Sequence, residues 1–130
     1  MSFPPAPARF FASDNFSGAH PRYLSAVERA NAGHVMAYGG DEITKHATKL
    51  FQEMCDTDVD VLFTFNGTGS NIVALGSLLR SAESVLCSEW AHIHVDETGA
   101  PEHILGIKLQ DVNSPDAKVT PAHIVAAASA

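Results

Sequence analysis

The stretch from Asp60 to Leu79 constrains the fold of this chain most, because it joins a strand-like run to a helix-like run through a turn of small residues. Residues 59–65 are β-branched and aromatic, which predicts a buried strand. Residues 71–80 carry apolar side chains at helical spacing, which predicts a helix. Residues 66–70 lie between the two and have no bulky side chain, so a ligand can approach their backbone.

This strand–turn–helix unit is typical of an anion-binding site. The first N–H groups of a helix lack partners within the helix, and the helix dipole favours negative charge beside them. Thr68 and Ser70 add hydroxyl donors. Gly67 and Gly69 are not followed by the third glycine of a dinucleotide fingerprint or by the lysine of a nucleotide P-loop. The pattern favours a small phosphorylated ligand or cofactor. The alternative is a tight turn that needs glycine for its φ angles and binds nothing.

Composition narrows the class of protein. The chain has 130 residues, of which 45% are hydrophobic, and this suits one domain with one core. Its formal charge of −7 argues against binding to nucleic acid or to an anionic membrane. No apolar run reaches the roughly 18 residues of a membrane span. Cys55 and Cys87 lack CxxC spacing, which predicts reduced thiols in a cytoplasmic protein.

The rest of the chain predicts alternating helices and strands. Proline-rich residues 1–9 should form a disordered lead-in, and residues 10–18 an irregular polar loop. Three helices are expected. The first covers residues 21–33, the second runs from an N-cap at Asp41 to Met54, and the third starts at Pro121 and covers residues 122–128. Further strands are expected over residues 84–87 and 106–112.

This alternation predicts an α/β architecture with a largely parallel sheet. Three strands are few for such a sheet, because helices must cover both of its faces. The chain is therefore expected to be part of a domain.

A histidine-rich segment, residues 87–97, follows the strand predicted at 84–87. The carboxyl ends of strands in an α/β sheet face the ligand crevice, so this segment and the glycine-rich turn can share one site. If the segment is extended, His92 and His94 lie on the same side and could bind a metal together with Glu97. Alternatively, the two histidines lie at a loop surface, or His92 alone stacks on an aromatic cofactor and relays protons. Solvent-facing or capping positions are expected for the other histidines, His20, His34, His46, His103 and His123.

Four segments taken together resemble the threonine aldolases, which are pyridoxal-phosphate enzymes of the aspartate-aminotransferase fold. These segments are residues 11–15, residues 37–41, residues 65–71, and a pair of runs over residues 87–92 and 96–102. Their order and spacing fit the family from about residue 10 to about residue 121. The resemblance implies that residues 10–130 are part of the pyridoxal-phosphate-binding large domain of a fold type I enzyme, with an incomplete, mostly parallel sheet and crossover helices.

The resemblance also implies a reaction, the reversible retro-aldol cleavage of L-threonine or L-allo-threonine to glycine and acetaldehyde. Pyridoxal 5'-phosphate would accept the electrons left at Cα. The phosphate cup would be formed by Gly67, Thr68 and Gly69. The ring of His92 would stack on the cofactor and handle the proton of the substrate hydroxyl. The substrate would be held, or its site supported, by Ser13, Tyr38 and Glu97.

The family also uses a Schiff-base lysine in a later Gly- and Thr-rich segment. None of the lysines of this chain lies in such a context: Lys45, Lys49, Lys108 and Lys118. The resemblance therefore implies a fragment that lacks the second half of the large domain and the small domain, and that is inactive alone. Intact relatives are homo-oligomers whose sites draw on two subunits. Another pyridoxal-phosphate lyase or transferase of the same fold is an alternative. So is a non-catalytic metal- or ligand-binding module built on His92, His94 and Glu97.

Overall fold

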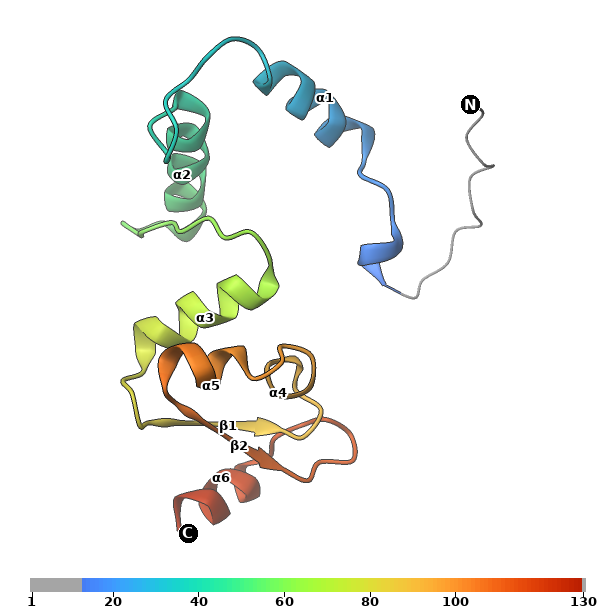
Figure 1. The fold of residues 1–130 in the computed structure, drawn as a ribbon, viewed down its shortest axis with the longest axis vertical. Helices are drawn as coiled ribbons and strands as arrows, with labels where there is room; N and C mark the ends of the chain where they lie inside the picture. Colours follow the sequence, from blue (N-terminus) through green and yellow to red (C-terminus); the bar gives the residue numbers. More distant parts are fainter. Residues whose placement is uncertain (1–12, 130) are drawn as a thin grey trace. The chain divides into compact units, whose positions relative to one another are not determined.

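The computed structural model describes residues 13–129, and the chain divides into two compact units, Met1–Val61 and Leu62–Ala130. The predicted lead-in over residues 1–9 lies outside the described residues. Unit 1 contains the 3-10 turn Asp14–Phe16, α1 (Pro21–Ala30) and α2 (Glu42–Cys55) (Figure 1). The helices and strands of unit 2 are α3 (Gly67–Leu78), β1 (Ser84–Ser88), α4 (His92–Val95), α5 (Ala100–Leu105), β2 (Lys108–Val112) and α6 (Pro121–Ala128).

The helices of unit 1 begin where their sequence signals predict. α1 starts at Pro21, and Nδ1 of His20 accepts a hydrogen bond from the Arg22 amide. Asp41 caps α2, because its carboxylate accepts from both the amide and the hydroxyl of Thr44, at 2.8 and 2.6 Å. No residue of either helix is buried. Local capping signals therefore mark where these helices begin, although no buried face holds them.

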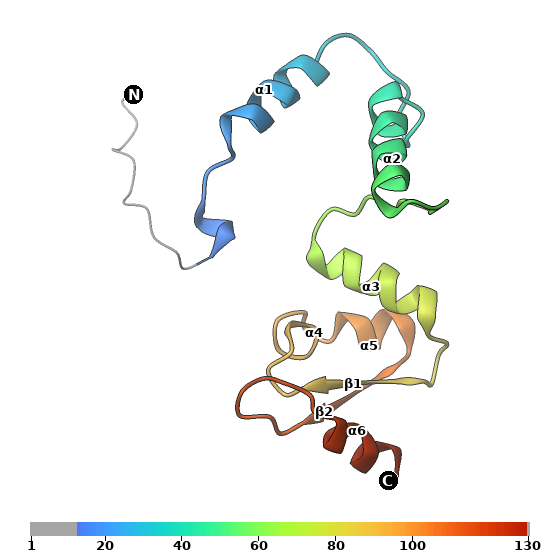
Figure 2. The same ribbon diagram turned by 180° about the vertical axis from the view of Figure 1, so that it is seen from behind.

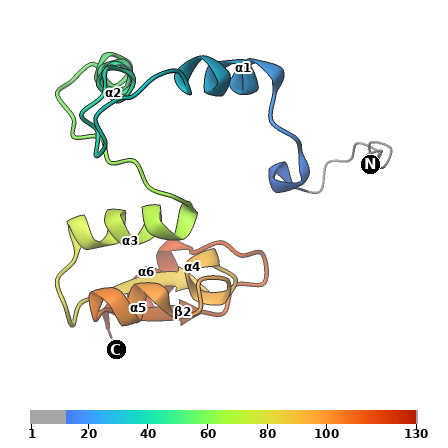
Figure 3. The same ribbon diagram turned by 45° about the horizontal axis from the view of Figure 1, so that its top comes forward.

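The sheet of unit 2 is parallel, as predicted. β1 pairs with β2 in a register that sets Ser84 opposite Lys108 and Ser88 opposite Val112. α4 and α5 lie in the connection between the two strands, which is the crossover that a parallel pair requires. Figures 1 and 2 show α3 and α5 on one side of this strand pair and α6 on the other. Figure 3 gives a tilted view of the same elements.

A small core lies where the helices meet the sheet. Cys87, Ile107 and Leu109 are each only 6% exposed. Apolar residues of α3, α4 and α5 and their ends pack around them: Leu75, Leu79, Ile93 and Leu105. α3 approaches α5 closely at Gly76, where an added Cβ would lie 3.1 Å from Cδ2 of Leu105. A small residue at this position lets the two helices touch.

One predicted strand is absent, and one predicted helix begins earlier than expected. Residues 59–65 are not a buried strand, because they have no regular structure and Leu62 and Phe65 are 70% and 103% exposed. A strand needs a ladder partner, and within residues 13–129 only β1 and β2 pair. The helix predicted from residue 71 begins at Gly67 instead.

No helix in the described part of the chain has both the length and the apolar character needed to cross a bilayer.

Candidate functional site

The first turn of α3 carries free backbone donors. Asn66 is the N-cap, and its Oδ1 accepts from the Gly69 amide at 2.8 Å. The Asn66 carbonyl accepts from the amide and the hydroxyl of Ser70, at 3.1 and 3.2 Å. The amides of Gly67 and Thr68 are the remaining donors of this turn, and neither has a partner among residues 13–129. Two N–H groups at a helix N-terminus can therefore bind an anion.

The glycines of this turn are not there for their φ angles. Neither Gly67 nor Gly69 has a positive φ, so the reading of a turn that merely needs glycine for its geometry is wrong. A Cβ on Gly67 would meet nothing within 4 Å. A Cβ on Gly69 would lie 3.3 Å from Oδ1 of Asn66 and would crowd the cap. The turn thus combines open space beside Gly67 with a tightly held cap behind it.

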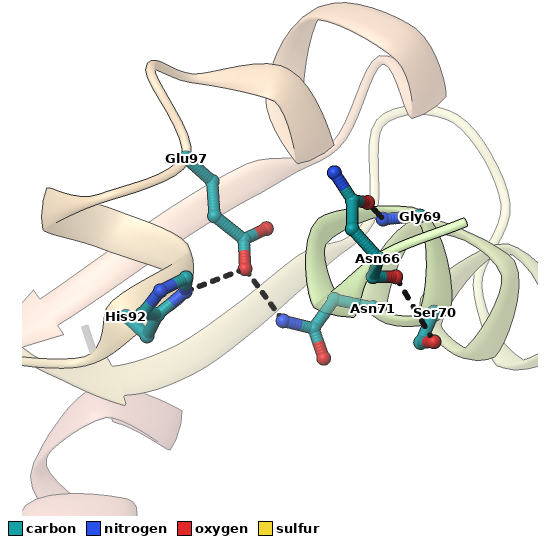
Figure 4. A network of polar contacts seen from close by, with 6 residues as sticks. All are labelled: Asn66, Gly69, Ser70, Asn71, His92 and Glu97. Carbon is teal, nitrogen blue, oxygen red and sulfur yellow. Dashed lines mark hydrogen bonds and ion pairs between the residues drawn. The ribbon is translucent and has the colours of Figure 1, made fainter. Parts of the chain in front are cut away.

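A hydrogen-bonded network connects α3 to α4 (Figure 4). Oε1 of Glu97 accepts from Nδ2 of Asn71 at 2.6 Å and lies 2.8 Å from Nδ1 of His92. Asn71 is on α3, four residues and about one turn after Gly67. His92 begins α4, and Glu97 follows that helix. The buried carboxylate therefore holds the histidine on the same part of the molecule as the first turn of α3.

The burial of these side chains is unequal and sets their chemistry. The side chain of Glu97 is 0% exposed, whereas that of His92 is 64% exposed. An ionised carboxylate only accepts, so with Glu97 in that form the hydrogen of the bond between them lies on Nδ1 of His92. Nε2 of a neutral His92 then carries a lone pair and is the atom that can accept a proton. The second oxygen of Glu97, Oε2, is buried and has no partner among the described residues.

The extended conformation considered for the histidine segment is wrong. His92 to Val95 form the short helix α4. In a helix, residues two apart do not face each other, so His92 and His94 are not on the same side. Within residues 13–129, no three His, Cys, Asp or Glu side chains are grouped so that they could hold a metal ion. Instead of serving as a metal ligand, Oε1 of Glu97 is engaged by Asn71 and His92.

Ser13 and Tyr38 lie in unit 1, so their part in the site stays a prediction. The Ser13 hydroxyl accepts from the Asn15 amide at 3.3 Å. Tyr38 is in the turn before α2, with a positive φ of 59° and a fully exposed side chain.

The remaining histidines occupy the capping and solvent-facing positions that were predicted. His20 caps α1, and His123 forms a capping box with Thr120 at the start of α6. The other three are exposed: His34, His46 and His103.

Sequence reasoning missed Asn71 and Asn66 as contributors to the site. Asn66 had a readable signal, because Asn is a favoured N-cap directly before a helix. Asn71 had none, since its partner is 26 residues away.

Comparison with known proteins assigns the chain to one family. The beta-eliminating lyase family matches residues 11–130. Over 115 residues, 88% of the chain, it is 50% identical to a low specificity L-threonine aldolase of Pseudomonas sp. strain NCIMB 10558 and 47% identical to one of Pseudomonas aeruginosa PAO1. The chain spans about a third (33%) of the length of these relatives.

A solved structure gives the same match. The threonine aldolase of Leishmania major superposes with a TM-score of 0.77 at 34% identity, covering 86% of this chain and 33% of the other. The predicted α/β fold class is therefore confirmed. The match also confirms the resemblance carried by the four sequence segments.

Proposed function

The chain belongs to the beta-eliminating lyase family, and from this membership we propose that it supplies part of the active site of a pyridoxal-phosphate-dependent threonine aldolase. The reaction would be the retro-aldol cleavage of L-threonine or L-allo-threonine to glycine and acetaldehyde. The low specificity L-threonine aldolases that it resembles support the choice of reaction. The observation that carries the proposal is the buried Glu97 carboxylate, which links His92 to the helix whose first turn has free amides.

The residues of the first turn fit a phosphate group. The free amides of Gly67 and Thr68 and the hydroxyl of Thr68 are all donors, and the positive end of the α3 dipole favours an anion beside them. The space beside Gly67 is open. Gly67, Thr68 and Gly69 would hold the phosphate of pyridoxal 5'-phosphate, with Gly69 keeping the cap tight. When bound, the cofactor supplies an electron sink for the carbanion left at Cα.

His92 would move the proton that the cleavage requires. As the Cα–Cβ bond breaks, the substrate hydroxyl becomes the carbonyl of acetaldehyde and loses its proton. Nε2 of His92 faces away from Glu97 and would accept that proton. The sequence resemblance implies that its ring would stack on the cofactor. Glu97 stabilises the resulting imidazolium through Nδ1–H. Ser13 and Tyr38 would bind the substrate, a role for which the support is the sequence resemblance.

The rest of the proposal concerns the setting of this site. Residues 10–130 would be part of the large cofactor-binding domain of a homo-oligomeric enzyme of the cytoplasm. Cys55 and Cys87 are both free thiols, which is compatible with a reducing compartment.

We also propose that the 130-residue chain alone does not cleave threonine. Lys45, Lys49 and Lys118 each lie within 4.0 Å of a carboxylate, and Lys108 lies on β2; none follows a Gly- and Thr-rich segment. Acetaldehyde release from L-threonine, followed with a coupled alcohol dehydrogenase, should therefore stay at the level of the blank. Turnover above the blank would contradict this.

The phosphate cup is tested by removing one amide without removing the helix. Gly67→Pro deletes the N–H at the first helical position, where proline is favoured. Asn66 has φ −153° and ψ 177°, a conformation that a residue before proline adopts readily. Gly67→Ala is the matched control, since it adds a Cβ into open space and keeps the amide. We expect Gly67→Pro to weaken the binding of pyridoxal 5'-phosphate about ten- to a hundredfold, the range for a hydrogen bond to a charged group.

Calorimetric titration of the wild-type chain and both variants measures this. Pyridoxal, which has no phosphate, should bind all three chains equally weakly. The proposal fails if Gly67→Pro binds pyridoxal 5'-phosphate as tightly as Gly67→Ala does, or if the wild-type chain prefers it no more than it prefers pyridoxal.

A further inference from the structure

The Glu97 carboxylate is held by two donors on one oxygen. Oε1 receives both the Asn71 amide, at 2.6 Å, and Nδ1–H of His92, at 2.8 Å. Oε2 is buried without a partner in the described part of the chain. Among the described residues, the hydrogen bonds of this buried carboxylate therefore come from Asn71 and His92.

We propose that Asn71 is a positioning residue for His92, acting through the Glu97 carboxylate. The role of His92 itself rests on the function proposed above. Asn71 touches neither reacting atoms nor the imidazole. It donates to the oxygen that accepts from Nδ1, so it determines where that oxygen lies and hence which ring nitrogen of His92 keeps its lone pair.

Removing the amide of Asn71 leaves a buried carboxylate with His92 as its one donor among the described residues. Such a group is poorly solvated, and it responds by rotating toward water or by taking up a proton. Rotation removes the acceptor from Nδ1, and a protonated carboxyl can donate its O–H to Nδ1 in place of accepting from it. The hydrogen of a neutral His92 is then free to move to Nε2, which blocks the atom that must accept the substrate proton.

The position of Asn71 on α3 connects His92 to the first turn of that helix. It lies about one turn after Gly67 on the same helix, so one rigid element presents the free amides at its start and the amide of Asn71 one turn later. His92 is thereby oriented relative to the turn proposed to bind phosphate. This coupling is absent for Ser77, further along α3, whose hydroxyl donates to the Ala74 carbonyl within the helix.

The test reads the imidazole of His92 in the ¹⁵N-labelled chain by long-range ¹H–¹⁵N NMR near pH 8, with His92→Gln to assign its signals. The wild-type chain should show the form with hydrogen on Nδ1. Asn71→Leu, of similar size without a donor, and the nearly isosteric Asn71→Asp should both lose this form and show a mixture of the two tautomers. Asn71→Gln, which keeps an amide donor, should restore it, and Ser77→Ala should not change it.

Two results would overturn the proposal. One is hydrogen on Nε2 in the wild-type chain, and the other is an unchanged Nδ1–H form in both Asn71→Leu and Asn71→Asp. Having both variants guards against one of them failing to fold, which the amide signals of β1 and β2 report. The readout uses neither cofactor nor substrate, so a failure of the phosphate-cup test is distinguishable from a failure here.

Discussion

The two units of the chain contain similar helices but differ in what holds them. In unit 1, α1 and α2 have capped N-termini and amphipathic sequences, yet none of their residues is buried. In unit 2, α3 and α5 pack on a sheet around Cys87, Ile107 and Leu109. Local signals mark where a helix starts and stops, whereas a buried core needs segments that are distant in sequence.

His92, the residue proposed to accept the proton, and Glu97, which holds it, both belong to unit 2 for a physical reason. Glu97 is fully buried, and its contact with Asn71 bridges 26 positions of sequence. Only packing of α3 near α4 can bring these two residues together. A preorganised proton acceptor needs such a rigid neighbourhood, because a side chain held by local contacts alone samples several rotamers.

The largest effect should come from removing a core side chain. Leu109→Ala deletes a buried side chain that is 6% exposed, so we expect a loss of about 2–5 kcal/mol in the free energy of unfolding of unit 2. The matched variant in unit 1 is Leu24→Ala, whose side chain is 59% exposed and whose effect should stay within about 0.5 kcal/mol. Urea titration followed by circular dichroism and by the fluorescence of Trp90 measures both. Equal effects of the two substitutions would contradict the contrast between the units.

The two cysteines provide a kinetic version of the same contrast. Cys55 ends α2 and is exposed, whereas Cys87 lies in the core. Burial raises the pKa of the Cys87 thiol, and the nearby carboxylates of Asp111 and Glu102 raise it further. Alkylation requires the thiolate and access to it, so at about pH 8 iodoacetamide should modify Cys55 at least about tenfold faster than Cys87.

Mass spectrometry of peptides from timed samples gives both alkylation rates. Leu109→Ala should accelerate the modification of Cys87 and leave that of Cys55 unchanged, because local opening of the core limits the first rate alone. If Cys87 reacts as fast as Cys55 in the wild-type chain, the core is not a protected unit.

Much of the fold could be predicted because its signals are local. The Asp41 cap and the apolar spacing behind it predict α2, and Pro21 and Pro121 mark the starts of α1 and α6. The strand predicted over residues 59–65 failed because β-propensity describes side chains, while a strand exists only with a ladder partner.

The same division between local and long-range features applies to the candidate site. The backbone donors at Gly67 and Thr68 could be predicted from the sequence, because they belong to one short segment; that they bind an anion stays a prediction. The pairing of Asn71 with Glu97 could not, because nothing in the spacing of two polar residues 26 positions apart indicates that they meet. The tautomer proposed for His92 rests on that pairing and could not be predicted from the sequence either.

The smallest expected effect concerns the caps of the two units and depends on pH. The hydroxyl and the amide of Thr44 donate to Asp41 and hold the pKa of its carboxyl below the usual value of 3.8. A pKa that is lowered in the folded state contributes stability that is complete above about pH 4 and is lost as the pH falls through the lowered value. The first turn of α2 should therefore fray below about pH 4, whereas the neutral Asn66 cap of α3 does not titrate.

Cα chemical shifts of both first turns, measured between about pH 6 and pH 2, report this fraying separately for each helix. Asp41→Asn keeps an acceptor without the charge and should remove the pH dependence in α2, because the titrating group is gone while the cap remains. If the first turn of α2 frays at the same pH in the wild-type chain and in Asp41→Asn, a group other than Asp41 controls the fraying.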